Sequence, residues 1–590
     1  MQQLILIHIG PVQDFIASAR RSRDLWYGSW VLSELSKAAA AAVQSQAASN
    51  RLIFPASGLD LVAGSEINVA NRIVALVDNP AAAAKEAKTA VNTRLKELRL
   101  DALKNLKGPL RDEQDAIAQI QELPEIFWVS SSMDSSYEAA RKMAEALLAA
   151  RKNTRGFKQP SWGANAPKSS LDGVRESVIP RVAYDQPDTL FWKYGARRAE
   201  QLSGVDLLKR LGNRGDESRF PSTSHMAARP LLKRLSQQPD IQKAWRNYVG
   251  KLPSEIKDVE KVPPHHSYPV FGDLDGSVLF GSRLAENLDG DALEAVQKAL
   301  AAFLHETVAG EEPIPYYALL LGDGDGMGKV IDAQKTPDKH INLSQNLAAF
   351  AVQVRQIVAE YEGALVYAGG DDVLAFLPLH TALPCAKALA DSFRQQLAGF
   401  VNSVGAQATF SAGIAISHHL EPLSDALQLA RNSERLAKAV PGKDALAVAM
   451  DKRGGITRAI SGKWETLYPQ LLRSIYYQRE SVDAFPAGAA YELRDAVLEM
   501  GGEAHLEKAP ELQQVVIQEA RRILLRKRAQ QGQQPLPQSV IDSIEAVIVD
   551  QDSPISELAE ALVIARLFAR AEDQAGLPVT APAGIKELTA

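Results

Sequence analysis

Residues 314–328 read IPYYALLLGDGDGMG and residues 364–379 read ALVYAGGDDVLAFLPL, and these two stretches decide the fold of the second half of the chain. The first predicts a short apolar strand over 316–321 that runs into a Gly/Asp loop. The second predicts two short strands separated by a Gly-Gly-Asp-Asp turn, which indicates a β-hairpin. The amphipathic stretch SQNLAAFAVQVRQIVAEY lies between them, and a helix, a strand, a helix and the strand DALAVAM are expected to follow. This βαββαβ order predicts a ferredoxin-like unit.

The first part of the chain shows the same order. LILIHIG (4–10) predicts a buried strand that stops at Gly10-Pro11, and the apolar spacing after it predicts one long helix over 14–46. RLIFPASG, INVANRIVALVD and EIFWVSSS are expected to be strands, with Ala/Lys-rich helices between the last two. The fold class is therefore α/β (α+β), with two ferredoxin-like domains. The expected domains are 1–190 (ferredoxin-like), 191–312 (mostly helical linker), 313–455 (second ferredoxin-like) and 456–590 (C-terminal, helical).

Composition excludes several classes of protein. The 590 residues are 46% hydrophobic and 23% charged, which rules out a disordered, collagenous or coiled-coil chain. The net charge of −5 provides no global basic field, so any RNA contact must come from local patches or partner subunits. The single cysteine, Cys385, excludes a disulfide framework and a cysteine-based zinc ribbon. No signal peptide and no membrane-length apolar run is present, so we expect a cytoplasmic protein without a membrane partner.

Two acidic segments carry the strongest indication of chemistry. Strands one and three of a βαββαβ sheet are neighbours, so the loop with Asp323 and Asp325 should meet the turn with Asp371 and Asp372 at one sheet edge. Converging carboxylates form an all-oxygen site that suits Mg²⁺ or Mn²⁺. Two such ions activate a 3′-hydroxyl and stabilise a leaving pyrophosphate in an in-line displacement. Each motif alone is usually a solvated turn, but their joint placement favours a catalytic site.

The glycines around these acids fit a nucleotide site. Gly369 and Gly370 allow a tight turn and let a bulky nucleotide approach the backbone. Gly326, Gly328 and Lys329 open the next predicted helix, whose N-terminal amides are candidates to hold phosphates.

The motifs also carry a family resemblance. YAGGDDVLAF with GDGDGMG resembles the palm domain of nucleotidyl cyclases, diguanylate cyclases and polymerases, and its Gly-Gly-Asp-Asp resembles the large signature subunit of type III CRISPR effector complexes. Four further segments resemble type III-B members: IGPVQDFIASARRSRDLWYGSW (9–30), KSSLDGVRES (168–177), RFPSTSHMAARP (219–230) and DLDGSVLFGSRL (273–284).

This resemblance implies a subunit of an RNA-guided complex that, on sensing target RNA, polymerises ATP into cyclic oligoadenylate messengers. Its implied partners are the repeat-handle-binding, small helical and backbone subunits, the guide RNA and the target RNA. The implied cofactors are two Mg²⁺ or Mn²⁺ ions, with ATP as substrate. The C-terminal helices resemble the family's thumb-like domain.

Roles for single residues follow from the same resemblance. Asp323 resembles the first metal ligand, with the carbonyl of Gly324 a second contact, and Asp371 and Asp372 resemble the metal-binding hairpin carboxylates. Related palms often use only the first of the two acids in the first loop, which leaves Asp325 open.

The resemblance also assigns nucleotide contacts. Ser411 and Gly413 resemble the strand beneath the nucleotide, and Lys438 and Lys443 resemble residues that clamp the triphosphate, although each lysine alone equally fits an ordinary solvated charge. The corresponding strand end of the first domain has no paired acids. There Gly10, Pro11 and Asp14 are candidates for an acceptor-nucleotide pocket.

Two departures from the family pattern change the expectations. No histidine is followed by Asp, so no nuclease domain of the His-Asp type and no single-stranded DNA cleavage are expected. The four-cysteine zinc site of many relatives is missing, so zinc is not predicted, and His265 and His266 are expected to be surface loop residues. The basic runs 19–23 and 526–528 are either solvated helix faces or RNA contacts. Trp26, Tyr27 and Trp30 are expected in the core.

The leading hypothesis is an RNA-activated oligoadenylate synthase. Three rivals remain. The first is a structural subunit whose palm no longer turns over, and the second is a stand-alone nucleotide cyclase. The third keeps the palm chemistry but joins ATP to another acceptor, such as S-adenosylmethionine.

Overall fold

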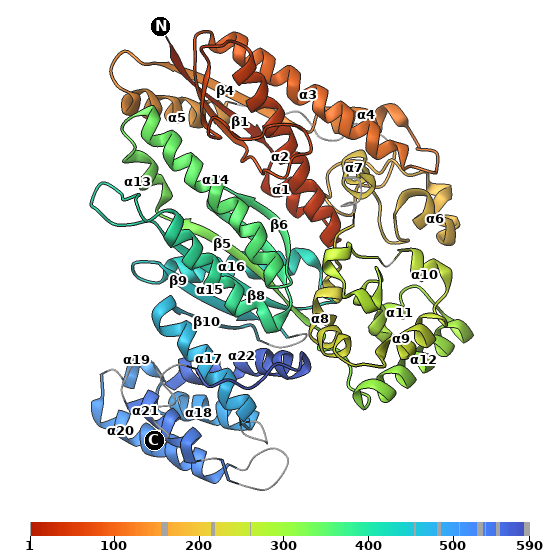
Figure 1. The fold of residues 1–590 in the computed structure, drawn as a ribbon, viewed down its shortest axis with the longest axis vertical. Helices are drawn as coiled ribbons and strands as arrows, with labels where there is room; N and C mark the ends of the chain where they lie inside the picture. Colours follow the sequence, from red (N-terminus) through yellow and green to blue (C-terminus); the bar gives the residue numbers. More distant parts are fainter. Residues whose placement is uncertain are drawn as a thin grey trace.

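The structure is a computed structural model of the chain. It describes residues 2–154, 163, 165–213, 219–259, 261–452, 456–480, 485–506, 508–527, 535–536, 538–549 and 555–582. Two β-sheets with helices on both faces form its upper and central parts, and the C-terminal helices lie at the opposite end from the first sheet (Figure 1). None of the described helices is both long enough and apolar enough to span a bilayer.

The first sheet is antiparallel with the strand order β2-β3-β1-β4, which is the ferredoxin-like order. Its strands are β1 (Gln3–Gly10), β2 (Arg51–Phe54), β3 (Arg72–Val77) and β4 (Glu125–Ser132). Alternation along β1 sends Ile5, Ile7 and Ile9 toward α2 (Ser22–Ser45) and α3 (Pro80–Lys104), while Leu4 and Leu6 pack toward α5 (Tyr137–Asn153). The sheet is therefore covered on both faces.

The long helix expected over 14–46 is interrupted. It is observed as α1 (Gln13–Ala17) and α2, with residues 18–21 between them. The ammonium group of Lys209, 194 residues further along, donates to the carbonyl of Phe15 (3.1 Å) and also bonds the carbonyl and the hydroxyl of Ser18. These carbonyls are thereby bonded from outside the helix, and this contact from a distant segment is the physical reason for the break.

The second sheet has six strands in the order β10-β9-β8-β5-β7-β6. β8-β5-β7-β6 is again the ferredoxin-like order, and β9 runs parallel to β8. The six strands are β5 (Tyr316–Asp325), β6 (Ala364–Gly369), β7 (Asp372–Leu377), β8 (Thr409–His418), β9 (Ala445–Met450) and β10 (Arg458–Lys463).

Two expectations need correction here. β10 pairs with β9, so the chain beyond residue 455 is not entirely helical. β5 continues to Asp325 instead of ending at Leu321, because β8 pairs with it as far as Asp325↔Thr409. Asp323 and Asp325 therefore lie in a strand and not in a loop.

Helices cover both faces of the second sheet. α14 (Pro337–Glu360) and α15 (Leu379–Gln396) pack on one face, and α16 (Leu423–Ala439) packs on the other beside α8 (Thr223–Ser236) and α2. The short helix α13 (Met327–Asp332) follows β5. Since α2 belongs to the first domain and contacts β6, the two ferredoxin-like units face each other across this surface.

The segment between the two units is helical. Buried residues of α8 such as Met226 and Leu231 share one core with Tyr317 and Phe376 of the second sheet, so the linker helices extend the core of that sheet. The helices of this segment are α6 (Pro187–Tyr194), α7 (Gly204–Leu211), α8, α9 (Ile241–Val249), α10 (Ser254–Val259), α11 (Gly281–Leu284) and α12 (Gly290–Val308), while α4 (Glu113–Gln121) precedes β4 within the first unit.

One histidine prediction in this region is wrong and the aromatic prediction is confirmed. His265 is exposed as expected, but His266 is only 8% exposed, and its carbonyl accepts from His225 Nε2 and from Arg229. Those two hydrogen bonds hold the loop against α8, and this is why His266 is buried. Trp26, Tyr27 and Trp30 are all in the core.

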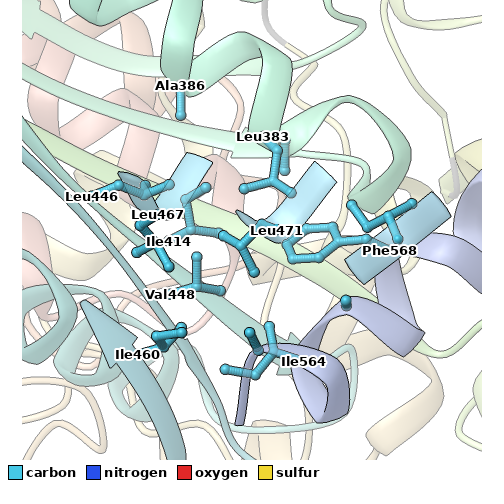
Figure 2. Close-up of a cluster of buried hydrophobic side chains, with 14 of the residues drawn as sticks. Leu383, Ala386, Ile414, Leu446, Val448, Ile460, Leu467, Leu471, Ile564 and Phe568 are labelled. Carbon is cyan, nitrogen blue, oxygen red and sulfur yellow. The ribbon is translucent and has the colours of Figure 1, made fainter. Parts of the chain in front are cut away.

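The C-terminal helices pack against the far end of the second sheet. Figure 2 shows Leu383 and Ala386 of α15 and strand residues such as Ile414 and Val448 meeting Leu471 of α17 and Phe568 of α22. This continuous core joins the helical region to the sheet. The helices are α17 (Trp464–Glu480), α18 (Ala487–Glu499), α19 (Glu503–Leu506), α20 (Pro510–Arg526), α21 (Gln538–Val549) and α22 (Ile555–Gln574). Arg528 of the second basic run lies outside the described residues.

Candidate active site

Asp323 and Asp372 lie on neighbouring strands at the same level. The antiparallel pairing of β5 with β7 runs from Ala318↔Leu377 to Gly322↔Val373, so the next step along the ladder places Asp323 beside Asp372. Alternation puts both carboxylates on the face that also carries Leu321 and Leu374. The predicted meeting of the two acidic segments at one edge of the sheet is therefore present in the structure.

Both carboxylates line a cavity of about 430 Å³ between the two ferredoxin-like units. The first domain contributes Val12, Gln13, Ser29 and Ser33 together with the loop 68–71. The second contributes Tyr367 and Gly369 near the hairpin and one face of α16. This volume falls in the usual range for a small-molecule site, and the cavity lies between two domains, where such sites are common.

Asp371 occupies a different position from its neighbour. A Cβ at Gly324 would lie 2.9 Å from the Cβ of Asp371, so the hairpin turn packs directly on the end of β5. Burial and the adjacent Asp372 carboxylate raise the pKa of Asp371 to about 7, and partial desolvation raises the pKa of Asp372 to about 6. The surroundings therefore disfavour two ionised carboxylates at this turn, and a bound cation would stabilise the ionised pair.

Asp325 and Ser411 bond to each other behind the cavity. One carboxylate oxygen of Asp325 accepts from the Ser411 hydroxyl (2.8 Å), the Thr409 hydroxyl (2.9 Å) and the Asp444 amide (3.0 Å). Ser411 is fully buried. Both residues thus tie β5 to β8 and to the turn before β9, and they do not line the cavity.

Gly413 has a packing role on the same strand. A Cβ there would lie 2.2 Å from the Glu434 amide nitrogen, so only glycine lets α16 approach β8 this closely. This approach brings the charged face of α16 to the cavity. Arg431, Glu434 and Arg435 line the cavity from that helix.

Lys438, the next charged residue on α16, contacts the Asp323 carboxylate and bonds Glu434 Oε1 at 2.8 Å. Burial and the nearby Lys443 lower the pKa of Lys438 to about 8. Lys443 itself lies in a turn, with φ of +52°, and its carbonyl accepts from Lys463. The structure thus brings Lys438 into direct contact with Asp323, and Lys443 lies near Lys438.

The predicted glycines divide into two groups. Gly370 has φ of +74° and supports the tight hairpin turn, and Gly369 lines the cavity. Gly326 and Gly328 are exposed at the start of α13, outside the cavity lining. α13 has only six residues, which makes it a short anchor for phosphate.

The first-domain candidates border the cavity without lining it. Gly10 ends β1 opposite Glu125, and Asp14 is exposed, while Val12 and Gln13, directly after Gly10-Pro11, form the wall. The segment directly after Gly10-Pro11 therefore borders the cavity, through Val12 and Gln13 and not through the predicted residues.

Several cavity residues were not predicted from the sequence. On α2, the Ser33 hydroxyl accepts from the Val69 amide (2.9 Å), and Glu34 accepts from the Gly64 amide (3.0 Å), so α2 holds the loop that forms one wall. Ser29, the loop 68–71 and Tyr367 carry no local motif. The spacing 431, 434, 435 and 438 does place four charged residues on one face of a helix, and this signal was available.

The donor set is consistent with a hard divalent cation. The donors that line the cavity are the Asp323 and Asp372 carboxylates, and the Gly324 carbonyl is a further oxygen ligand that the family resemblance implies. Asp323 already holds a cation, the Lys438 ammonium. Among the described residues, no group of three or more His, Cys, Asp or Glu side chains is close enough to hold an ion. The two carboxylates therefore provide part of a coordination shell, which suits an ion that keeps water and phosphate ligands.

Two facing ferredoxin-like units, with paired carboxylates at adjacent strand ends of one of them, define a protein with two palm-type domains. Residues 316–447 match the family model described as Cas10/Cmr2, second palm domain, and residues 4–100 match that of CRISPR-associated protein Cmr2, N-terminal. Segments in both palm-type domains are thus similar to the Cas10/Cmr2 large subunits of type III-B complexes.

One curated relative and two solved structures show the same similarity. The CRISPR system Cmr subunit Cmr2 of Pyrococcus furiosus is 27% identical over an alignment of 567 positions that covers 79% of this chain and only 63% of that protein's length. A type III-B Cmr-beta apo structure matches with a TM-score of 0.60 at 14% identity, covering 96% of this chain and 81% of the other. The Cmr-beta structure bound to cognate target RNA matches with a TM-score of 0.59 at 13% identity, covering 94% and 83%. These two structural matches support the fold.

Proposed function

We propose that this chain is the nucleotidyl-transferring subunit of an RNA-guided type III complex, and that on binding of target RNA it converts ATP to cyclic oligoadenylate. The observation that carries the proposal is the pairing of Asp323 with Asp372 on one face of a cavity bounded by both palm-type domains. The matches to Cmr2 support the other subunits, guide RNA and target RNA as partners.

The reaction joins the 3′-oxygen of one ATP to the α-phosphorus of a second. A P–O bond to the hydroxyl oxygen forms, the bond to the leaving phosphate breaks, and pyrophosphate and the hydroxyl proton are released. Asp323, Asp372 and the Gly324 carbonyl would hold Mg²⁺ or Mn²⁺, which supplies Lewis-acid activation of the hydroxyl and charge stabilisation of the pyrophosphate.

The remaining cavity side chains position the substrates. Arg431 and Arg435 present guanidinium groups that suit phosphate oxygens, and Lys438 adds an ammonium group once Asp323 binds a metal in its place. Ser29, Ser33 and the loop 68–71 offer hydrogen-bonding groups from the first domain. One domain thus supplies the charged groups for the donor triphosphate, and the other supplies the acceptor wall.

The test uses the assembled complex with guide RNA, matching target RNA, Mg²⁺ or Mn²⁺ and labelled ATP, with and without S-adenosylmethionine. Target-dependent cyclic oligoadenylate that disappears in Asp323→Asn and Asp372→Asn supports the proposal. A product that forms only with S-adenosylmethionine retains the site but changes the acceptor. Absence of any product would favour a structural subunit.

A further inference from the structure

The cavity of about 430 Å³ that carries Asp323 and Asp372 is called the nucleotide cavity below, after the proposed function. A second cavity, of about 800 Å³, lies beside it. Three parts of the molecule form its walls: the α1–α2 break (residues 17–23), the linker helices, and the loop 419–424 between β8 and α16. Among the described residues, only Ala17 lines both cavities.

The second cavity is basic in an acidic chain. Eight Arg and Lys residues line it against four carboxylates. Two carboxylates outside the lining, Asp24 and Asp273, also pair with these cations, which leaves two positive charges in a chain whose net charge is −5. The cationic residues are Arg20, Arg21, Arg23, Arg197, Arg210, Arg219, Lys261 and Arg283. Such a concentration of one charge in a concave site attracts anions.

Two arginines of the α1–α2 break, Arg20 and Arg21, can still bind an anion. Arg210 donates to both oxygens of Glu200 at 3.0 Å, so Arg21 reaches that carboxylate only at 3.5 Å and lies over the Phe191 ring. Burial and the adjacent Arg210 lower the pKa of Arg21 to about 10. Arg20 is exposed and has no hydrogen-bond or ion-pair partner within the part of the chain that the structure describes. The helix break is what directs these two side chains to the cavity.

The cavity walls opposite the α1–α2 break also carry more cations than carboxylates that pair with them. In two places a single carboxylate serves two cations. Asp273 pairs with Arg219 (2.8 Å) and Lys261 (3.4 Å), and Glu286 pairs with Arg197 and Arg283 (2.7 Å).

We propose that this cavity binds a segment of single-stranded RNA through its phosphodiester groups. Dispersed cations with serine and threonine hydroxyls are the groups that hold a nucleic-acid backbone, and Phe191 and Phe220 provide aromatic surface for bases. The positive charges come from three walls instead of converging on one point, which fits a strand and not a single phosphate. RNA as the class of ligand rests on the proposed function.

Bound RNA in this cavity would contact both elements that border the nucleotide cavity. The α1–α2 break leads into α2, and the loop 419–424 leads into α16, which carries Arg431, Glu434 and Lys438. The site thus gives RNA direct contact with the framework of the active site.

The test measures binding of fluorescein-labelled single-stranded RNA of about ten nucleotides to the full chain by anisotropy, between about 50 and 200 mM salt. The variant Arg20→Ala/Arg219→Ala removes two exposed cations of the cavity that are not part of the nucleotide site. The matched control Arg246→Ala/Arg570→Ala removes two exposed arginines elsewhere. Labelled ATP binding to each variant is measured in parallel.

We expect about tenfold weaker RNA binding for the cavity variant, and a slope of log K against log salt that is shallower by about 1.4, for two lost phosphate contacts. The control variant and ATP binding should match the wild type. Equal RNA affinity in both variants, or no RNA binding by the wild type, would overturn the inference. Competition by free ATP at the same cavity would replace RNA with a mononucleotide ligand and would also overturn it. RNA binding as expected by a wild type whose assembled complex makes no nucleotidyl-transfer product would contradict the proposed function alone.

Discussion

The ammonium group of Lys438 contacts the carboxylate of Asp323, across the junction between α16 and the end of β5. The same ammonium bonds Glu434 at 2.8 Å, so one cation lies between two carboxylates of the nucleotide cavity. In the proposed function, a divalent ion at Asp323 would take over this charge compensation. Lys438 would then be free to contact the phosphates of the substrate.

This relationship predicts that Lys438→Ala raises the KM for ATP by about tenfold, because one charge-assisted phosphate contact is lost. Steady-state kinetics of the target-bound complex measures it. Lys438→Arg should recover part of the affinity. Lys443→Ala is the comparison variant and should change KM less, because Lys443 lies in the turn before β9, whereas Lys438 contacts Asp323. A larger effect at Lys443 would contradict the assignment.

The carboxylate pair predicts a separate outcome. Asp323→Asn or Asp372→Asn should lower kcat by at least about 10²-fold, since each removes a negative ligand at the reacting centre. Isothermal titration with Mn²⁺ provides a readout independent of turnover, and metal affinity should fall in both variants. Unchanged Mn²⁺ binding in both would show that the ion is held elsewhere.

Asp325 should behave differently from Asp323 although only Gly324 separates them. Asp325→Ala removes the acceptor of three hydrogen bonds that join β5 to β8 and the turn before β9, so it should lower the free energy of unfolding by on the order of 3 kcal/mol. Asp323→Ala should change it by less than about 1 kcal/mol, because Lys438 keeps Glu434 as a partner. Denaturant unfolding of the two variants tests this, and equal destabilisation would contradict it.

The βαββαβ pattern and the two Asp-containing segments were enough to predict that Asp323 meets Asp372, because strand order alone determines that contact. The opposite roles of Asp323 and Asp325 could not be read in the same way. Both face one side of β5, and only the partner strand β8, with Thr409 and Ser411, decides that Asp325 is a structural acceptor.

Contacts between distant segments explain the other differences. The helix period continues through residues 18–21, and long-range contacts such as the bonds from Lys209 to Ser18 and Phe15 interrupt it. β10 has a short and weakly patterned sequence that becomes a strand because β9 offers an unpaired edge. The buried position of His266 likewise depends on Arg229 in α8.

A buried ion-pair group beside the α1–α2 break gives a pH prediction. Glu200 bonds Arg210 at 3.0 Å and lies near Arg21, and these guanidinium groups outweigh the effect of burial and hold the pKa of Glu200 at about 2, against 4.5 for the unperturbed carboxyl. The folded state thus binds this proton less readily than the unfolded state. Ionised Glu200 stabilises the fold above pH 4.5, by about 3 kcal/mol, and this stabilisation is lost as the pH falls toward 2.

The wild type should therefore lose about two thirds of this contribution by pH 3, whereas Glu200→Gln should show no such loss. Denaturant unfolding at pH 6 and pH 3 measures the difference: Glu200→Gln should be clearly less stable than wild type at pH 6 and much closer to it at pH 3. Glu306→Gln, at an exposed position of α12, is the control and should follow the wild type at both pH values. A stability gap between wild type and Glu200→Gln that is equal at both pH values would contradict this prediction. It would show that Glu200 stabilises the fold through its packing and not through its charge beside Arg210.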